Sequence, residues 1–208
     1  MNLDYNKLLK TIYTLNLNGY LNRNPQLLDA IEWNRKLFNI IILDESNHNV
    51  KNIISKDEIF IWLKDNIGWP QACDYLRIKL ISEFDYECFI DMDIILMDAK
   101  LAEYGNYIAR YDSTNHLNCD IIKGKSLAKI LYKWFLTNYK KYEVDFMLTY
   151  DLISNIHINN YIDYCCLFNL SCQEREQHKI GIYKAKSIEE YLKYSPKNGL
   201  YMYLKEIE

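Results

Sequence analysis

The sequence lacks the features that would place it across a membrane or outside the cell. Its longest apolar runs, such as residues 40–43, are far too short to span a bilayer. The first residues, MNLDYNKLLK, contain no positively charged leader followed by an apolar core. The six cysteines form no CxxC pair, as expected of reduced thiols. We therefore expect a cytoplasmic protein, with a peripheral membrane contact left open.

The chain also lacks an excess of basic residues. A net charge of −3 and a pI near 5.9 give no whole-chain attraction to nucleic acid, so we expect no nucleic-acid partner. No internal repeat, low-complexity linker or clear domain boundary is visible. With 208 residues, half of them hydrophobic, the chain can bury a substantial core. These features predict one domain that covers residues 1–208.

The first half of the sequence alternates strand and helix patterns. Residues 10–17 read as a strand, and Asn24-Pro25 as the N-cap and first position of a helix. Residues 39–44 form a continuous apolar run, which is typical of a strand covered on both faces. Strand, helix and strand in this order imply a parallel pair.

Further helices and strands follow. Ser55 and Glu58 form a capping-box pattern for a helix that ends near Gly68, and an apolar stripe predicts a helix from Pro70. We expect strands over residues 88–97, 106–111, 179–184 and 200–204, helices over 126–139 and 187–194, and no clear assignment for 144–156. The whole predicts an α/β domain, parallel in its first half and mixed later.

An acid pair, Asp91 and Asp93, lies in the expected strand 88–97. Strand side chains alternate with period two, so both carboxylates should project to the same side. Two acids beside apolar residues are costly unless a cation lies between them, and carboxylate oxygens suit a divalent ion. The alternative is a strand end that simply reaches solvent.

Two segments around this pair resemble a known enzyme family. Residues 72–77, ACDYLR, followed by residues 89–96, FIDMDIIL, resemble glycosyltransferase family 32 and the related capsular-polysaccharide and toxin-type sugar transferases. In that group an Ala/Ser-Asp-x-x-Arg helix leads into a strand that ends in Asp-x-Asp. Residues 10–13, 24–38 and 40–47 resemble the upstream strands and helix, so the similarity is ordered over about the first hundred residues.

The resemblance implies a GT-A fold, a Rossmann-like mixed sheet flanked by helices. Residues 1–100 would form the nucleotide-sugar-binding half and residues 101–208 the acceptor-side half. The implied reaction transfers a sugar, with retention, from a UDP- or GDP-sugar to a glycan, lipid-linked or protein acceptor, with Mn²⁺ or Mg²⁺. The implied catalytic residues are Asp91 and Asp93. Asp93 would bind the metal, and Asp91 would bind the nucleotide-sugar donor and serve as a second candidate metal ligand. Tyr13, Asp74, Arg77 and Asn118 would also bind the donor.

The sequence departs from the family pattern in two places. Asp85-Tyr86 stands where the family usually has Gly-Gly, and the carboxyl-terminal GLYMYLKEIE has no counterpart to the family's His/Trp segment. His157 and His178 are candidates for the missing ligand. A degenerate, non-catalytic binding protein therefore stays open, as does a metal-dependent nucleotidyltransferase, although no Gly-rich phosphate loop is present.

Two charge patterns have more than one interpretation. Asp74 and Arg77 are three residues apart, which also fits an ordinary surface pair on a helix. Lys125, Lys129 and Lys133 recur every four residues in the expected helix 126–139 and its flank. Such a stripe is usually a solvated face, and the alternative is contact with a membrane surface.

Overall fold

A mixed six-stranded sheet lies at the centre of the computed structural model, which describes residues 10–25, 27–96, 107–111, 116–141, 161–163 and 201–203. The strands follow the order β2 (Asn39–Leu43), β1 (Thr11–Leu15), β3 (Cys88–Ile90), β6 (His116–Lys123), β5 (Tyr107–Tyr111) and β7 (Tyr161–Asp163). β1 runs parallel to both β2 and β3, whereas β6 runs antiparallel to β3 and β5. The parallel first half and mixed second half of the α/β prediction are thus confirmed.

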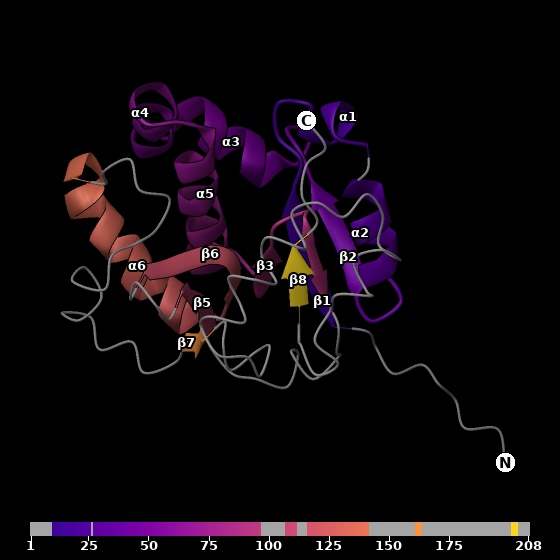
Figure 1. Cartoon of the computed structure of the whole chain (residues 1–208). Coiled ribbons are helices and arrows are strands. Elements are labelled where there is room, and N and C mark those ends of the chain that lie inside the picture. The colour runs from indigo at the N-terminus through magenta and orange to yellow at the C-terminus, as the bar shows by residue number, and fades with distance from the viewer. Residues whose placement is uncertain are drawn as a thin grey trace, which may run out of the picture.

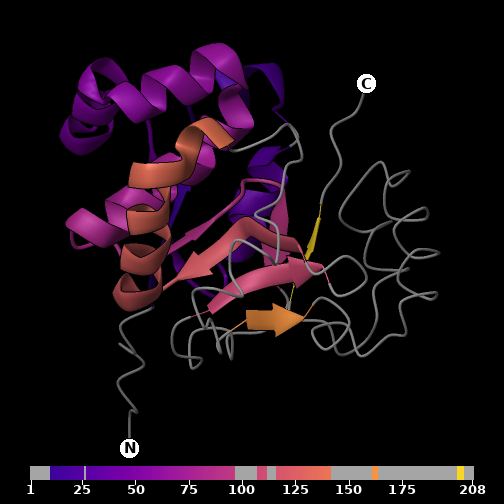
Figure 2. The ribbon, with the colours of Figure 1, turned by 90° about the vertical axis from the view of Figure 1, so that its left-hand side faces the viewer.

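Six helices and one 3₁₀ turn surround the sheet (Figure 1). They are α1 (Tyr20–Arg23), α2 (Leu27–Asn34), α3 (His48–Lys56), α4 (Glu58–Asn66), α5 (Trp69–Glu83), α6 (Lys125–Asn138) and η2 (Tyr139–Lys141), counted among the described residues. Figure 2 shows β6, β5 and β7 side by side, with α5 and α6 next to them. α2 lies apart from α3–α6, near β2 (Figure 1).

α5 is the central helix of the main core. Its buried Tyr75, Leu76 and Leu80 pack in one cluster with Phe89 of β3 and Phe135 of α6. Gly68 allows this helix to start, because its φ of 153° lies in a region that favours glycine and Pro70 follows within the first turn. The helices predicted from Pro70 and over residues 126–139 are confirmed, and both pack in the same core as β3.

The predicted strand over residues 88–97 is wrong, because the chain turns after β3. The Ile94 N–H donates to the Asp91 carbonyl over 3.2 Å, and β4 (Ile94–Leu96) then leaves the sheet. β4 pairs antiparallel with β8 (Tyr201–Tyr203) in a separate two-stranded sheet. The run stays apolar on both sides of the turn, so the hydrophobic pattern gives no sign of it.

Two further strand and helix assignments need correction. β2 is an edge strand with Ile41 36% exposed, so it is not covered on both faces. Asn24 does not cap the next helix, because it ends α1 by donating its side-chain amide to the Tyr20 carbonyl over 3.1 Å, and α2 begins at Leu27. α1 was not expected.

The capping-box prediction is also wrong. The Ser55 hydroxyl donates to the Lys51 carbonyl over 2.6 Å inside α3, a helix that the pattern did not predict. The carboxylate of Asp57 caps α4 instead, accepting from the backbone N–H groups of Ile59 and Phe60. β6 was likewise not expected, and the assignments over residues 144–156, 179–184 and 187–194 lie outside the described residues.

Candidate functional site

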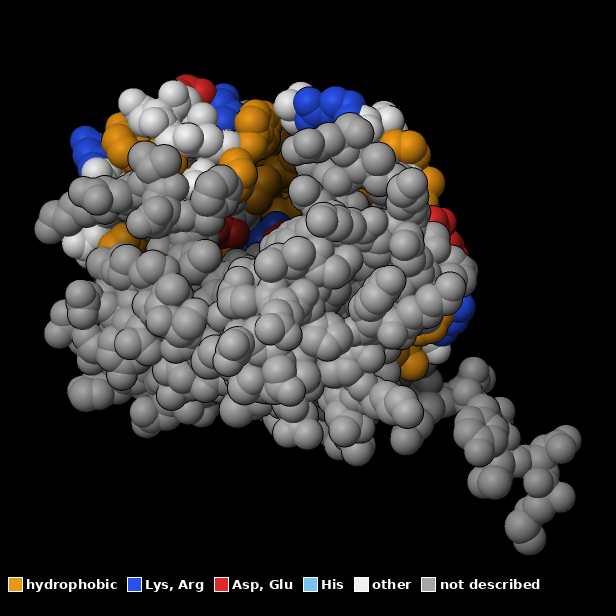
Figure 3. Space-filling model, in the orientation of Figure 1, with side chains coloured by type: hydrophobic (Ala, Val, Ile, Leu, Met, Phe, Trp, Pro, Cys, Tyr) orange, Lys and Arg blue, Asp and Glu red, His pale blue; other side chains and the backbone are white. Residues whose placement is uncertain are grey.

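Polar residues follow three parallel strands at the same edge of the sheet. β1, β2 and β3 end at Leu15, Leu43 and Ile90, and the Asn16 N–H still donates to the Leu43 carbonyl over 2.8 Å. Asp44 and Asp91 come directly after β2 and β3. In open α/β sheets this edge is where ligands bind. Figure 3 shows a recess on one face of the molecule, with hydrophobic side chains on its wall and charged side chains at its floor.

The acid pair lies on the tight turn between β3 and β4. The Met92 side chain is buried and anchors the turn, whereas Asp91 and Asp93 are half-buried. The expectation that strand alternation aligns the two acids is therefore wrong, because neither belongs to a strand. They still interact, since the negative charge of Asp91 raises the pKa of Asp93.

Arg77 of α5 joins this turn to the sheet. Its Nη1 donates to Asp74 Oδ1 over 3.2 Å and to the Cys119 carbonyl of β6 over 3.1 Å. Its Nη2 forms an ion pair with Asp91 Oδ1. The Arg77 side chain is only 8% exposed and that of Asp74 13%, so the alternative of an ordinary surface pair is wrong.

The electrostatics of Arg77 follow from these partners. Burial alone would lower the pKa of Arg77, but Asp91 and Asp74 outweigh burial and hold the pKa above its usual value. The guanidinium thus stays charged. One buried donor, Nε of Arg77, has no hydrogen-bond partner among the described residues.

Asp93 has the opposite environment. Burial, and then the charge of Asp91, raises the pKa of Asp93 to about 7. A carboxyl group with this pKa is partly protonated near neutral pH. A cation bound beside Asp93 would restore its ionised form, because opposite charge lowers a carboxyl pKa.

The donor set suits a cation that arrives with a phosphate-bearing ligand. Over the described ranges no three or more His, Cys, Asp or Glu side chains are grouped to hold a metal. The candidate ligands are the carboxylate oxygens of Asp91 and Asp93. Arg77 already pairs with one of them, Asp91 Oδ1. Mg²⁺-type sites commonly use one or two carboxylates and complete the shell with substrate phosphates and water. His157 and His178 lie outside the described residues.

The remaining candidate residues, Tyr13 and Asn118, lie in β1 and β6 of the central sheet. Tyr13 pairs in register with Phe89, two positions before Asp91, and its ring packs edge-on against Tyr86 at 4.8 Å. Asn118 lies in β6, one position before Cys119, whose carbonyl binds Arg77. The donor-side roles of Tyr13 and Asn118 stay predictions.

Asp85-Tyr86 stands where the sugar-transferase family that the sequence resembles usually has Gly-Gly, so an aromatic side chain is present at this position. The Tyr86 hydroxyl accepts from the Asn49 side-chain amide over 3.3 Å, next to the start of α3. Neither Asp85 nor Tyr86 has a positive φ, since Asn18 is the non-glycine residue in the described chain that does. This loop therefore follows a path that needs no glycine.

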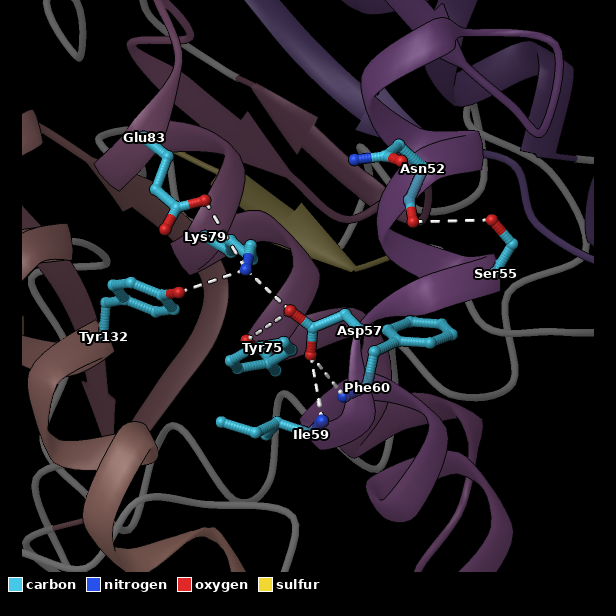
Figure 4. A network of polar contacts seen from close by, with 9 residues as sticks. All are labelled: Asn52, Ser55, Asp57, Ile59, Phe60, Tyr75, Lys79, Glu83 and Tyr132. Atoms are coloured by element: carbon cyan, nitrogen blue, oxygen red, sulfur yellow. Dashed lines mark hydrogen bonds and ion pairs between the residues drawn. The ribbon is translucent and has the colours of Figure 1, made fainter.

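A second polar network, centred on Asp57 and Lys79, connects three helices (Figure 4). Asp57 Oδ2 accepts from the Tyr75 hydroxyl over 3.0 Å and from Lys79 Nζ over 2.6 Å. Lys79 Nζ also donates to the Tyr132 hydroxyl of α6 over 3.0 Å and pairs with Glu83 at 3.5 Å. Because it links α4, α5 and α6, this network fixes the helix that carries Asp74 and Arg77.

The lysine stripe lies on the exposed face of α6. Lys125, Lys129 and Lys133 are all exposed, and Lys125 Nζ lies 3.6 Å from Asp85 Oδ1. Within the part of the chain that the structure describes, no helix has the length and apolar character needed to cross a membrane. Contact of this face with a membrane surface stays a prediction.

One residue near the turn was not expected from the sequence. The buried Asn34 side chain, at the end of α2, hydrogen-bonds the backbone of β4 at both Ile94 and Leu96. A single asparagine at the end of a helix carries no sequence signal for such a role.

The chain was also compared with known proteins. No protein-family model matches it, and no curated protein is significantly similar to it in sequence.

Proposed function

We propose that this protein is a metal-dependent glycosyltransferase with a GT-A fold. The observation that carries the proposal is the tight turn at the carboxyl edge of the parallel strands, where Asp91 and Asp93 lie together and Arg77 binds Asp91. The resemblance of residues 72–77 and 89–96 to sugar transferases supports the same assignment. The substrate would be a UDP- or GDP-sugar and the acceptor a glycan, a lipid-linked sugar or a protein.

Each residue of the turn has a proposed role. Asp93 and the oxygen of Asp91 not engaged by Arg77 would hold Mn²⁺ or Mg²⁺. When bound there, the cation would neutralise the negative charge that develops on a nucleoside diphosphate leaving group. Arg77 would orient Asp91 through their ion pair, and Asp74 would orient Arg77. Transfer would proceed with retention at the anomeric carbon.

Thermal unfolding with a panel of nucleoside diphosphates, UDP- and GDP-sugars, and nucleoside triphosphates tests this proposal, each with and without Mn²⁺. We expect one nucleotide sugar to raise the Tm only when Mn²⁺ is present. A preference for a nucleoside triphosphate would indicate a nucleotidyltransferase, and no stabilisation by any ligand would indicate a non-catalytic protein.

Matched variants sharpen the test. Asp93→Asn should abolish the Mn²⁺-dependent shift. Asp65→Asn removes an acid with a 56% exposed side chain on α4, away from the turn, and should leave the shift unchanged.

A further inference from the structure

The amide of Asn34 binds the edge of β4 as a neighbouring strand would. Asn34 Nδ2 donates to the Ile94 carbonyl and Asn34 Oδ1 accepts from the Leu96 N–H, each over 2.7 Å. These partners also fix which end of the amide is nitrogen, since a carbonyl accepts and an N–H donates. Asn34 is 1% exposed, so both bonds are shielded from water.

The backbone groups of Ile94 and Leu96 on the edge of β4 away from β8 all have partners. In a strand, the N–H and C=O groups of residues i and i+2 point to the same side. The Ile94 N–H closes the turn onto the Asp91 carbonyl, and the Leu96 carbonyl accepts from Trp33 Nε1 over 3.0 Å. Trp33 and Asn34 of α2 therefore provide the hydrogen-bond partners for the Ile94 carbonyl and for the N–H and carbonyl of Leu96, which the turn does not satisfy.

This contact begins one residue after Asp93. On the other side of the turn, β3 is held between β1 and β6, so Asp91 is fixed by the sheet and by Arg77. β4 does not belong to that sheet, and Asn34 lies 60 residues away from Ile94 in sequence. On the carboxyl side of the acid turn, β4 is thus held by α2 along one edge and by β8 along the other.

We infer that Asn34 is a positioning residue for the cation-binding turn and that it acts through the backbone of β4 on Asp93. The inference rests on the proposed function. Residues that orient metal ligands from outside the coordination shell typically change metal affinity by roughly 10- to 100-fold when substituted. Asn34→Asp keeps the acceptor for the Leu96 N–H but places a carboxylate oxygen against the Ile94 carbonyl.

The test is an electron paramagnetic resonance titration of Mn²⁺ in the presence of UDP or GDP, performed well below the Tm of each variant. Asn34→Asp should weaken Mn²⁺ binding by about tenfold. Leu63→Ala is the matched control, because it also damages a fully buried position, on α4, but does not touch the turn. It should keep the wild-type affinity, and wild-type affinity in Asn34→Asp would overturn the inference.

Hydrogen exchange separates this inference from the proposed function. In Asn34→Asp the new carboxylate oxygen repels the Ile94 carbonyl and should loosen β4, so the amides of Ile94 and Leu96 should exchange faster than in the wild type, whether or not a metal binds. Unchanged exchange would overturn the positioning role, while a wild type that binds neither Mn²⁺ nor nucleotide would overturn the proposed function. If Asn34→Asp does not fold, Trp33→Phe removes the bond to the Leu96 carbonyl but keeps an aromatic ring beside Lys36. It should show smaller changes in the same direction, and no change in either measurement would overturn the inference.

Discussion

Asp93 should make the free energy of unfolding fall as the pH rises from about 4 to about 7. In the unfolded chain an aspartate has a pKa near its usual value of 3.8, whereas burial and Asp91 raise the pKa of Asp93 to about 7 in the folded protein. Between these values the folded state holds a proton that the unfolded state has released. Stability rises with pH only where the unfolded state binds more protons, so here it must fall.

The size of the effect follows from the same two values. At about 1.4 kcal/mol per pH unit, the difference between 3.8 and about 7 corresponds to at most about 4 kcal/mol. Because Asp93 is half-buried, water screens part of this interaction, and we expect a loss of about 2–4 kcal/mol. Stability is fully present below the unfolded pKa and is lost as the pH rises through the folded value.

Urea unfolding followed by circular dichroism, at several pH values between about 4.5 and about 7.5, measures this loss. Asp93→Asn carries no titrating group, so the difference between wild type and variant isolates Asp93 from every other residue. We expect the variant to be the more stable protein at the upper end of the range. Saturating Mn²⁺ with the bound nucleotide should remove the slope in the wild type. Parallel curves for wild type and Asp93→Asn without metal would refute the reasoning.

Three further predictions concern other parts of the molecule. Arg77→Met should lower the free energy of unfolding, measured in urea, by about 3–5 kcal/mol, because it removes the buried cation that pairs with Asp74 and Asp91, and Arg77→Lys should not fully restore it. Asp57→Ala removes the α4 cap and one of the partners of Lys79, so it should lower the free energy of unfolding by about 2–4 kcal/mol, and Asp57→Asn, which keeps a capping oxygen, should lower it less. If α6 contacts a membrane, the double variant Lys129→Glu/Lys133→Glu should co-sediment less with anionic vesicles, because each lysine contributes about 1 kcal/mol of binding free energy. Binding to neutral vesicles should not change. Equal sedimentation of variant and wild type with anionic vesicles would argue against that contact.

The elements with a strong apolar pattern, periodic or continuous, were predictable from the sequence. β1, β2, α5 and α6 lie close to their expected bounds, because burial on one face of a helix or strand imposes its spacing on the residues. The parallel pairing of β1 with β2 followed from the order of the elements. The same reasoning placed Asp91 at the carboxyl edge of the sheet.

The details of the site were less accessible, because they depend on tertiary contacts. The turn at residues 91–93 interrupts an apolar run, and both sides of the turn are buried, so hydrophobicity does not mark it. Asp57 rather than Ser55 caps α4 because its second oxygen also meets Tyr75 and Lys79 from α5. The role of Asn34 depends on a partner 60 residues away in sequence.

Release of nucleoside diphosphate from UDP- and GDP-sugars tests the central claim most directly, because it requires a donor site with a cation at the acid pair. The assay compares the wild type with Asp91→Asn, Asp93→Asn and the double variant, with Mn²⁺ and with a chelator. We predict release by the wild type with Mn²⁺, and loss of that release in the chelator and in Asp93→Asn, with the fold retained by circular dichroism. Full release by the double variant, or by the wild type in the chelator, would contradict the account.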